Sequence, residues 1–329
     1  MEKYIENIDE YTSINLANEF KNMSINMQDG MVLKFDDNIS CSPFGMLLME
    51  NSIKAIRKEN PNKEFLIKLN KESNSIKYAA HMGFFKSISE DINFGKLPGE
   101  ASGSNNYVPI TRISFSNYRK NMIFQYMDPL RYIEYESRNL ARVLAQKNKQ
   151  LEELFTYMIR EIIRNSQEHG KVDEAWICAQ NWQNKGYAEI AVLDNGIGYK
   201  SSLEKKYGSL IQDDEKAIQF ALKPGITESH SNIYSQEEEN SGFGLYVASQ
   251  ICDELNGNFI IISGDTAIKR RNGSISIKKA YHEGSVIGMS IDTSKVFNYT
   301  ELLSKIVKKG ENTIKQNASD LSKGKFIMN

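Results

Sequence analysis

The sequence predicts an α/β protein made of two unequal units. Its 329 residues are enough for roughly two domains of about 150 residues each. In the first third of the chain, short strand-like runs alternate with helical patterns, and in the second half a helical stretch precedes several strands. Alternation of this kind is typical of sheets that are packed against helices.

The first unit, residues 1–110, is expected to be a small α/β domain. Its predicted elements alternate strand, helix, strand and helix over 31–36, 44–58, 64–69 and 75–85. An Asn-Pro-Asn sequence ends the first helix, and the last part of the unit is rich in Gly, Ser and Asn. Such residues favour turns and loops, so we expect a loop or linker there.

The second unit, residues 151–293, is expected to follow a helical connector at 111–150 and to precede a helical, Lys-rich tail at 294–329. Its predicted helices and strands are 151–168, 175–182, 187–193, 245–255, 259–263, 274–280 and 285–291. The polar segment 199–241 is too long for an idle connection in a compact domain. We therefore expect it to act as a lid.

Composition and charge exclude several classes of protein. The chain has 41 Lys and Arg residues against 42 Asp and Glu, and 25% of its residues are charged, which argues against a disordered chain and gives no overall field to attract nucleic acid. Three scattered cysteines suit a reducing cytosol better than a zinc site. We find no signal-peptide pattern and no apolar run of about 18 residues, so we expect a cytoplasmic protein without membrane contact. The Lys-rich tail is interpreted as a solvated terminus rather than a nucleic-acid site.

The first motif lies on a predicted helix. Glu161 and Asn165 are four residues apart, so both project from one polar stripe, opposite the apolar face. A carboxylate and an amide oxygen placed in this way can orient a water molecule and complete the shell of a hard cation such as Mg²⁺. Taken alone, the pair is more typical of a solvated helix face, because Glu and Asn at this spacing are common.

The second motif, Asp-Asn-Gly-Ile-Gly, follows the strand 187–193. Asp194 can accept a hydrogen bond from an exocyclic amine, and Gly196 and Gly198 permit close approach to a flat ligand. The alternative is a tight turn, for which this sequence is also common.

The third motif, Ser-Gly-Phe-Gly-Leu at 241–245, opens the helix 245–255. Gly242, Phe243, Gly244 and Leu245 precede free backbone N–H groups at the positive end of a helix dipole, which suit a polyphosphate. The alternative is a flexible hinge.

Together these motifs resemble the GHKL superfamily of ATPases. That superfamily includes the DNA gyrase B subunit, MutL-type repair proteins, chaperones of the Hsp ninety class, histidine kinases and anti-sigma-factor kinases. The resemblance covers about 150–293, with the motifs in family order on the expected helix, strand and loop. It implies a Bergerat fold, an α/β sandwich with helices on one face of a mixed sheet, and it implies ATP and Mg²⁺ as ligands.

The resemblance also assigns roles to individual residues. It implies that Asn165 ligates Mg²⁺, that Glu161 is the general base for hydrolysis, and that Asp194 accepts from the adenine amine. The glycines of the third motif correspond to the phosphate-binding glycines. Ser285, after Gly284, resembles the Gly-Thr pair that contacts adenine. Thr227 lies where relatives often carry a Ser or Thr of the lid, although a polar turn explains it equally well.

These features lead to three functional hypotheses. The main one is an ATP-binding, Mg²⁺-dependent ATPase whose slow hydrolysis drives a change of contacts, dimerisation included, in signalling or defence. The second is a serine/threonine kinase of the anti-sigma type that phosphorylates a partner protein, since the run REIIRNSQEHG at 160–170 is similar to that branch. The third is a non-catalytic nucleotide sensor. A conventional histidine kinase is disfavoured, because Glu161 replaces the usual Asn and the preceding helices carry no His.

The first unit resembles a STAS domain over roughly 30–90, in the order of its strands and helices. That resemblance implies a regulatory role and would place Ser40 or Ser42 near a phosphorylatable serine. The surrounding Ser-rich context of that family is missing, so a small α/β domain without a phosphorylation site is the favoured interpretation.

Overall fold

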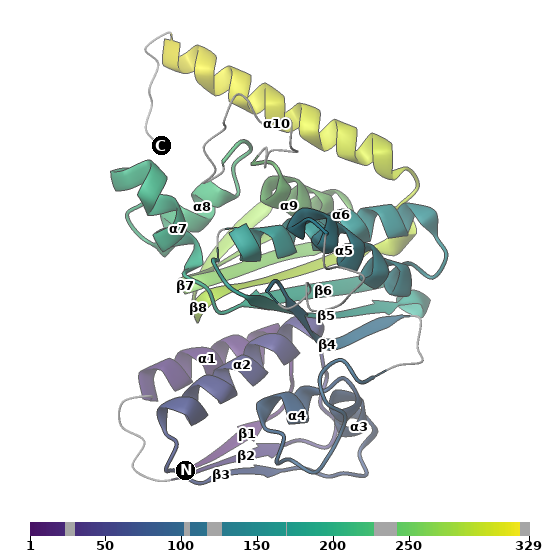
Figure 1. The fold of residues 1–329 in the computed structure, drawn as a ribbon, viewed down its shortest axis with the longest axis vertical. Coiled ribbons are helices and arrows are strands. Elements are labelled where there is room, and N and C mark those ends of the chain that lie inside the picture. The colour runs from purple at the N-terminus through teal and green to yellow at the C-terminus, as the bar shows by residue number, and fades with distance from the viewer. Residues whose placement is uncertain (24–29, 102–105, 117–126, 169, 227–241, 323–329) are drawn as a thin grey trace.

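Two stacked sheets, with helices between them and above the larger one, make up the protein (Figure 1). The computed structural model describes residues 1–23, 30–101, 106–116, 127–168, 170–226 and 242–322. In the last stretch the side chains are described as far as residue 315. Every helix in these ranges is too short or too polar to cross a membrane.

The larger sheet has five strands in the described part of the chain, in the order β4-β5-β6-β8-β7, and every neighbouring pair is antiparallel. The strands are β4 (Tyr107–Ser114), β5 (Glu174–Trp182), β6 (Tyr187–Asp194), β7 (Asn258–Arg271) and β8 (Ser274–Asp292). Short hairpin connections join β5 to β6 and β7 to β8. Because a tight hairpin can join only antiparallel strands, these connections determine the pairing.

Helices cover one face of this sheet. They are α5 (Pro129–Ala145), α6 (Lys149–Glu168) and α9 (Gly244–Glu254), which lie side by side above the strands (Figure 1). In α6 the apolar positions recur at helical spacing, and Phe155, Ile159 and Ile162 are buried against the sheet. This α/β sandwich is the architecture expected for the second unit.

The first unit forms a parallel three-stranded sheet, in the order β1-β2-β3, with its helices gathered on one face. Its elements are β1 (Glu2–Ile5), α1 (Glu10–Met23), β2 (Met31–Phe35), α2 (Pro43–Glu59), β3 (Phe65–Lys68), α3 (Asn74–His81) and α4 (Phe84–Ile88). Lys34, Leu66 and Lys68 on the other face are exposed. The resemblance to a STAS domain stays a prediction.

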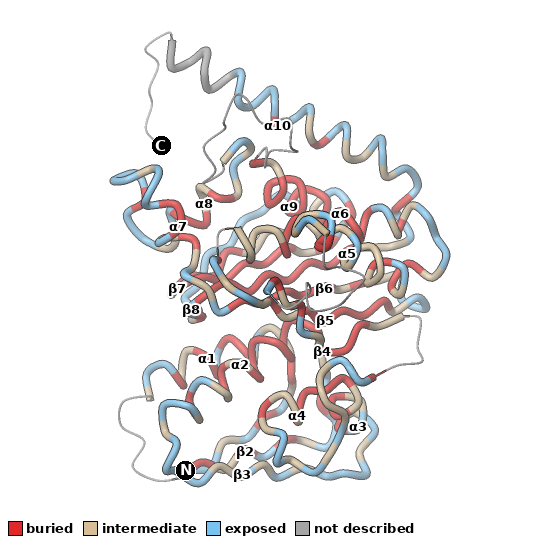
Figure 2. The backbone as a smooth tube through the Cα atoms, in the orientation of Figure 1, coloured by how far each residue is buried: buried red, intermediate tan, exposed pale blue. Residues whose placement is uncertain are grey.

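Helices α1 and α2 lie between the two sheets, so the larger sheet is covered on both faces (Figures 1 and 2). Strand β6 shows the consequence. Its side chains alternate, with Ile190 and Val192 packed beneath α6 and α9 while Ala191 and Leu193 pack in the cluster around α2. Burial on both faces explains why this strand is almost continuously apolar.

Several predicted details differ from the structure. In the described part of the chain the larger sheet is antiparallel rather than mixed, and helices of the first unit cover the face that the expected sandwich leaves open. The predicted boundary between residues 110 and 111 falls inside β4, which pairs with β5. The sequence did not predict β1 and α1. Strand β1 is short and helix α1 is only weakly amphipathic, so neither gives a clear periodic pattern of apolar residues.

The described part of the polar segment 199–241 is partly helical. It contains α7 (Gly198–Tyr207) and α8 (Asp214–Ala221). Both helices are short and contain few apolar residues, so the sequence pattern did not predict them. The tail forms a longer helix than expected, α10 (Tyr299–Ser322). Its Lys305 pairs with Glu254 of α9 at 2.7 Å, and Lys309 donates to Gln250 at 3.4 Å, so two of the tail lysines contact protein.

A partly buried carboxylate joins the two units. Glu189 on β6 accepts a hydrogen bond from the backbone N–H of Phe44, at the start of α2, over 3.0 Å. Loss of hydration raises the pKa of Glu189 to about 7, although the hydrogen bond from Phe44 opposes the rise. Glu10 of α1 also raises this pKa, while Lys269 of β7, which is paired with Glu10 at 2.7 Å, lowers it.

We expect Glu189 to make stability depend on pH. Its raised pKa favours the protonated form in the folded state, so its contribution is complete below about pH 4.5 and is lost as pH rises through 7. In urea titrations, the free energy of unfolding of the wild type should fall by roughly 1–3 kcal/mol relative to Glu189→Gln over this interval. Glu204→Gln, at an exposed position, serves as the control. Parallel pH profiles for wild type and Glu189→Gln would contradict the prediction.

Candidate functional site

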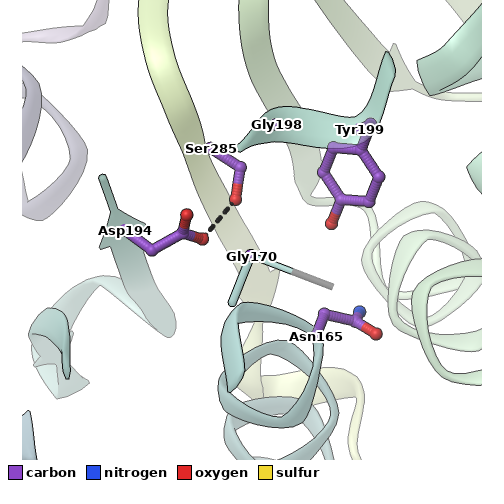
Figure 3. A pocket seen from close by; sticks show the side chains of 6 residues that line it. All are labelled: Asn165, Gly170, Asp194, Gly198, Tyr199 and Ser285. Carbon is purple, nitrogen blue, oxygen red and sulfur yellow. Dashed lines mark hydrogen bonds between the residues drawn. The ribbon is translucent and has the colours of Figure 1, made fainter. Parts of the chain in front are cut away.

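A pocket with about 200 Å³ of empty space lies at the C-terminal end of β6, beside the interior of β8 and the C-terminal part of α6 (Figure 3). It is lined by Asn165, Gly170, Asp194, Gly198, Tyr199 and Ser285. Asp194 points into the pocket from one side and faces Asn165 and Tyr199 (Figure 3). The structure thus brings together four residues that were predicted for ligand binding, namely Asn165, Asp194, Gly198 and Ser285.

Asp194 is the last residue of β6 and is 1% exposed. Its carboxylate accepts hydrogen bonds from Ser285 Oγ at 2.6 Å, Ser166 Oγ at 2.9 Å and the Gly196 N–H at 3.0 Å. An ionised carboxylate has about four acceptor sites. Three donors therefore fix its direction and leave acceptor capacity for a donor in the pocket, such as an exocyclic amine.

Asn165 lies on α6, on the other side of the pocket. Its amide nitrogen is buried and has no hydrogen-bond partner among the described residues. A buried polar group without a partner costs free energy, so this side chain is suited to interact with a ligand.

The side chains that line the pocket fit a Mg²⁺ ion that is held mainly by substrate phosphates and water. Within the described ranges, no group of three or more His, Cys, Asp and Glu side chains is placed to hold a metal ion. Mg²⁺ usually takes only one or two protein ligands and completes its shell with water and substrate phosphates. The carbonyl oxygen of the Asn165 amide can provide one such ligand, while its NH₂ group can donate to a phosphate oxygen.

Glu161 lies one helical turn before Asn165 and is 8% exposed, so it does not lie on a solvated helix face. Its Oε1 accepts from Arg160 Nη2 at 2.8 Å and from Arg160 Nε at 3.0 Å, and Arg160 also bonds Glu134 of α5 at 3.1 Å. Its Oε2 lies against Gly244, where an added Cβ would be only 2.2 Å from this oxygen. The start of α9 therefore packs directly on the Glu161 carboxylate, which its helix dipole favours.

The loop after Asp194 requires a glycine. Gly198 has φ +71°, a conformation that residues with a Cβ rarely adopt, and a Cβ there would meet Ser263 Oγ at 2.8 Å. The same hydroxyl accepts from the N–H of Tyr199 at 3.1 Å, which fixes the start of α7. Gly196 lines a wider groove that adjoins the pocket and has about 1150 Å³ of empty space, next to Lys171 and Lys200.

The third motif lies at the start of α9. The carbonyl of Gly242 accepts from the N–H of Gly225 at 3.1 Å, and the Phe243 and Tyr246 rings meet edge to face at 6.1 Å. Leu245 is buried in the core above the sheet. None of the four predicted residues of this motif lines the described pocket, and Thr227 lies outside the described residues.

Three pocket features were missed in the sequence. Ser166 follows Asn165 directly, Tyr199 follows Gly198 directly, and Gly170 ends the turn after α6. Ser166 and Gly170 lie inside the run REIIRNSQEHG at 160–170, and Tyr199 lies one residue beyond the second motif, so the roles of these residues were missed rather than their neighbourhood. Burial raises the pKa of the Tyr199 hydroxyl, and the charge of Asp194 raises it further, so this hydroxyl is a neutral donor.

Comparison with known proteins agrees with this geometry. Residues 150–294 match the model of the family described as "Histidine kinase-, DNA gyrase B-, and HSP90-like ATPase". This segment of the chain is therefore a domain of that family, and the predicted resemblance is confirmed at this level. No curated protein and no solved structure matches the chain.

Ser285→Ala is expected to weaken nucleotide binding about tenfold. The substitution removes the shortest of the three hydrogen bonds that orient Asp194, a loss of about 1–1.5 kcal/mol. Titration of a fluorescent ATP analogue measures the effect. Ser290→Ala, on the same strand but bonded to Asn258, is the control and should bind as the wild type does. Equal affinities for all three proteins would contradict the orienting role of Ser285.

Proposed function

We propose that this protein binds ATP together with Mg²⁺ and hydrolyses it slowly, and that the cycle switches its contacts with a partner protein or a second copy in the cytoplasm, in signalling or defence. One observation carries the proposal. A buried carboxylate with acceptor capacity left, Asp194, and a side-chain amide, Asn165, whose NH₂ group has no partner among the described residues, face each other across one pocket.

The binding step follows from these two groups. Asp194 accepts from the exocyclic amine of adenine, which is a donor, whereas guanine carries a carbonyl oxygen at the corresponding position and would be repelled. Asn165 holds Mg²⁺, which neutralises charge on the phosphates when it is bound. Backbone N–H groups at the start of α9, which no side chain caps, are suited to the phosphates.

Glu161 is the proposed general base for the attacking water. In the present conformation Arg160 bonds one of its oxygens and α9 covers the other. A base held in this way must be released or reoriented before it can act. This ion pair supports slow turnover, and it equally favours the alternative that the protein is a nucleotide sensor whose catalysis is absent or needs a partner.

Turnover of γ-labelled ATP distinguishes the proposed activities. Labelled inorganic phosphate that disappears when EDTA removes Mg²⁺ supports the ATPase. Labelled protein, in the chain or in an added partner, supports the kinase instead. Bound ATP that is recovered intact supports the sensor. If the purified protein does not bind ATP in the presence of Mg²⁺, all three are wrong.

A further inference from the structure

The N-terminal unit reaches the back of the pocket through one side chain. Asn51 of α2 lies beneath the end of β6, and its Oδ1 accepts a hydrogen bond from Asn195 Nδ2 at 3.1 Å. Its Nδ2 is 3.5 Å from Nδ1 of His282 on β8. Nε2 of His282 is in turn 2.7 Å from the backbone carbonyl oxygen of Asp194. These contacts join residues 144 and 231 positions apart in the sequence.

The hydrogen atoms in this network have one consistent arrangement. The carbonyl of Asp194 can only accept, so Nε2 of His282 carries the proton. His282 is 3% exposed and burial lowers its pKa, so the ring is neutral and Nδ1 accepts from the amide of Asn51. Asn51 then has its carbonyl oxygen free to accept from Asn195. Each of the three contacts thus joins a donor to an acceptor.

The network acts where β6 ends, while β8 continues beside β7. Asp194 pairs with Ser285 as the last register pair between β6 and β8. Beyond that pair, the Asp194 carbonyl is held by His282, and the next side chain is held by Asn51. Gly284 also packs closely there, since an added Cβ would lie 2.2 Å from the Asp194 carbonyl oxygen. A backbone held from behind sets the direction in which the Asp194 carboxylate points into the pocket.

We propose that Asn51 and His282 are positioning residues for the nucleotide pocket, so that the N-terminal unit forms part of the site that binds adenine. The inference rests on the proposed function, because it concerns the same pocket. It goes further in making the affinity for nucleotide depend on the docking of α2 against the large sheet. A partner that displaces α2 would therefore weaken nucleotide binding without touching the pocket.

Two substitutions at His282 separate positioning from bulk packing. The amide nitrogen of Gln extends as far as Nε2 and can donate to the Asp194 carbonyl, whereas that of Asn extends only as far as Nδ1. We expect His282→Asn to weaken ATP binding about tenfold, equivalent to about 1.4 kcal/mol. His282→Gln should stay within about threefold of the wild type. Because Gln is also one methylene longer than Asn, His282→Met is compared with both, since Met has the length of Gln but no N–H donor. A side chain needed only to fill space would let His282→Met bind ATP as His282→Gln does, whereas positioning predicts that His282→Met binds as weakly as His282→Asn.

The contribution of Asn51 is tested with Asn51→Leu, which keeps the size of the side chain and removes both hydrogen bonds. It should weaken ATP binding about five- to tenfold. Asn18→Ala is the matched control, because Asn18 also links the N-terminal unit to β8, through a 3.0 Å hydrogen bond to the Lys279 carbonyl, away from the pocket. It should bind ATP as the wild type does.

The experiment is an equilibrium titration of the full chain with ATP and Mg²⁺, with thermal melting of each unliganded variant as the check on folding. The inference is supported if the wild type binds ATP, Asn51→Leu and His282→Asn bind it more weakly, and His282→Gln binds it about as tightly as the wild type. If the wild type binds ATP and both Asn51→Leu and His282→Asn bind it with the same affinity, the inference is wrong and the proposed function still holds. Equal weakening in Asn18→Ala also overturns it. If His282→Asn does not fold, Asn51→Leu against Asn18→Ala decides. Absence of binding by the wild type instead overturns the proposed function.

Discussion

Asp194→Asn is expected to abolish detectable ATP binding, with affinity reduced about 100-fold or more, which corresponds to about 2.7 kcal/mol. The hydroxyls of Ser285 and Ser166 and the N–H of Gly196 all donate toward this carboxylate. The amide that replaces it has an NH₂ group where an acceptor is needed, so it leaves at least one donor unpaired in the buried site. It also cannot offer acceptors both to these groups and to the adenine amine.

Isothermal titration with ATP and Mg²⁺ measures the change. Asp173→Asn is a suitable control, because Asp173 is an exposed carboxylate next to β5, and it should bind as the wild type does. An affinity of Asp194→Asn within threefold of the wild type would show that adenine is not recognised here.

Glu161→Gln is expected to slow hydrolysis by roughly 10²–10⁴-fold, the usual contribution of a general base, while ATP affinity stays within about threefold. Gln keeps the size and polarity of the side chain and can still accept from Arg160, whose guanidinium bonds the carboxylate at 2.8 Å. It cannot take a proton from the attacking water. Retained ATP affinity together with a much lower rate of hydrolysis indicates a group that acts on the chemical step.

Glu168→Gln is the matched control for turnover. Glu168 lies on the same helix and is also paired with an arginine, Arg164, at 3.2 Å. It should hydrolyse ATP at the wild-type rate. If Glu161→Gln binds ATP and hydrolyses it at an unchanged rate, the general-base role is wrong.

The pocket was largely predictable from the sequence because its residues come in short local motifs. Asn165 and Asp194 stand at fixed places on a helix and at a strand end, where spacing alone predicts which way a side chain projects. Strands β5 and β6 were predictable for a similar reason, since they are apolar runs separated by a tight turn. Strand β4 lies where a linker and a helical connector were expected, and β8 is one strand where two were expected. The matching family model over 150–294 supports this part of the prediction.

The cover on the second face of the sheet was not predictable in this way. The position of α2 depends on packing between residues more than a hundred positions apart, as in the contact of Phe44 with Glu189. Asn51 is an ordinary polar residue on a helix until the fold brings it to Asn195. Single-sequence periodicity reports which face of an element is apolar, but it does not report what covers that face.

The most direct test of the central claim compares ATP with GTP in the wild-type protein. Isothermal titration in the presence of Mg²⁺ should give one bound ATP per chain, with GTP bound about 100-fold more weakly or not at all, because Asp194 accepts from an amine that only adenine offers at that position. Binding of both nucleotides with equal affinity, or of neither, would contradict the assignment of this pocket to ATP.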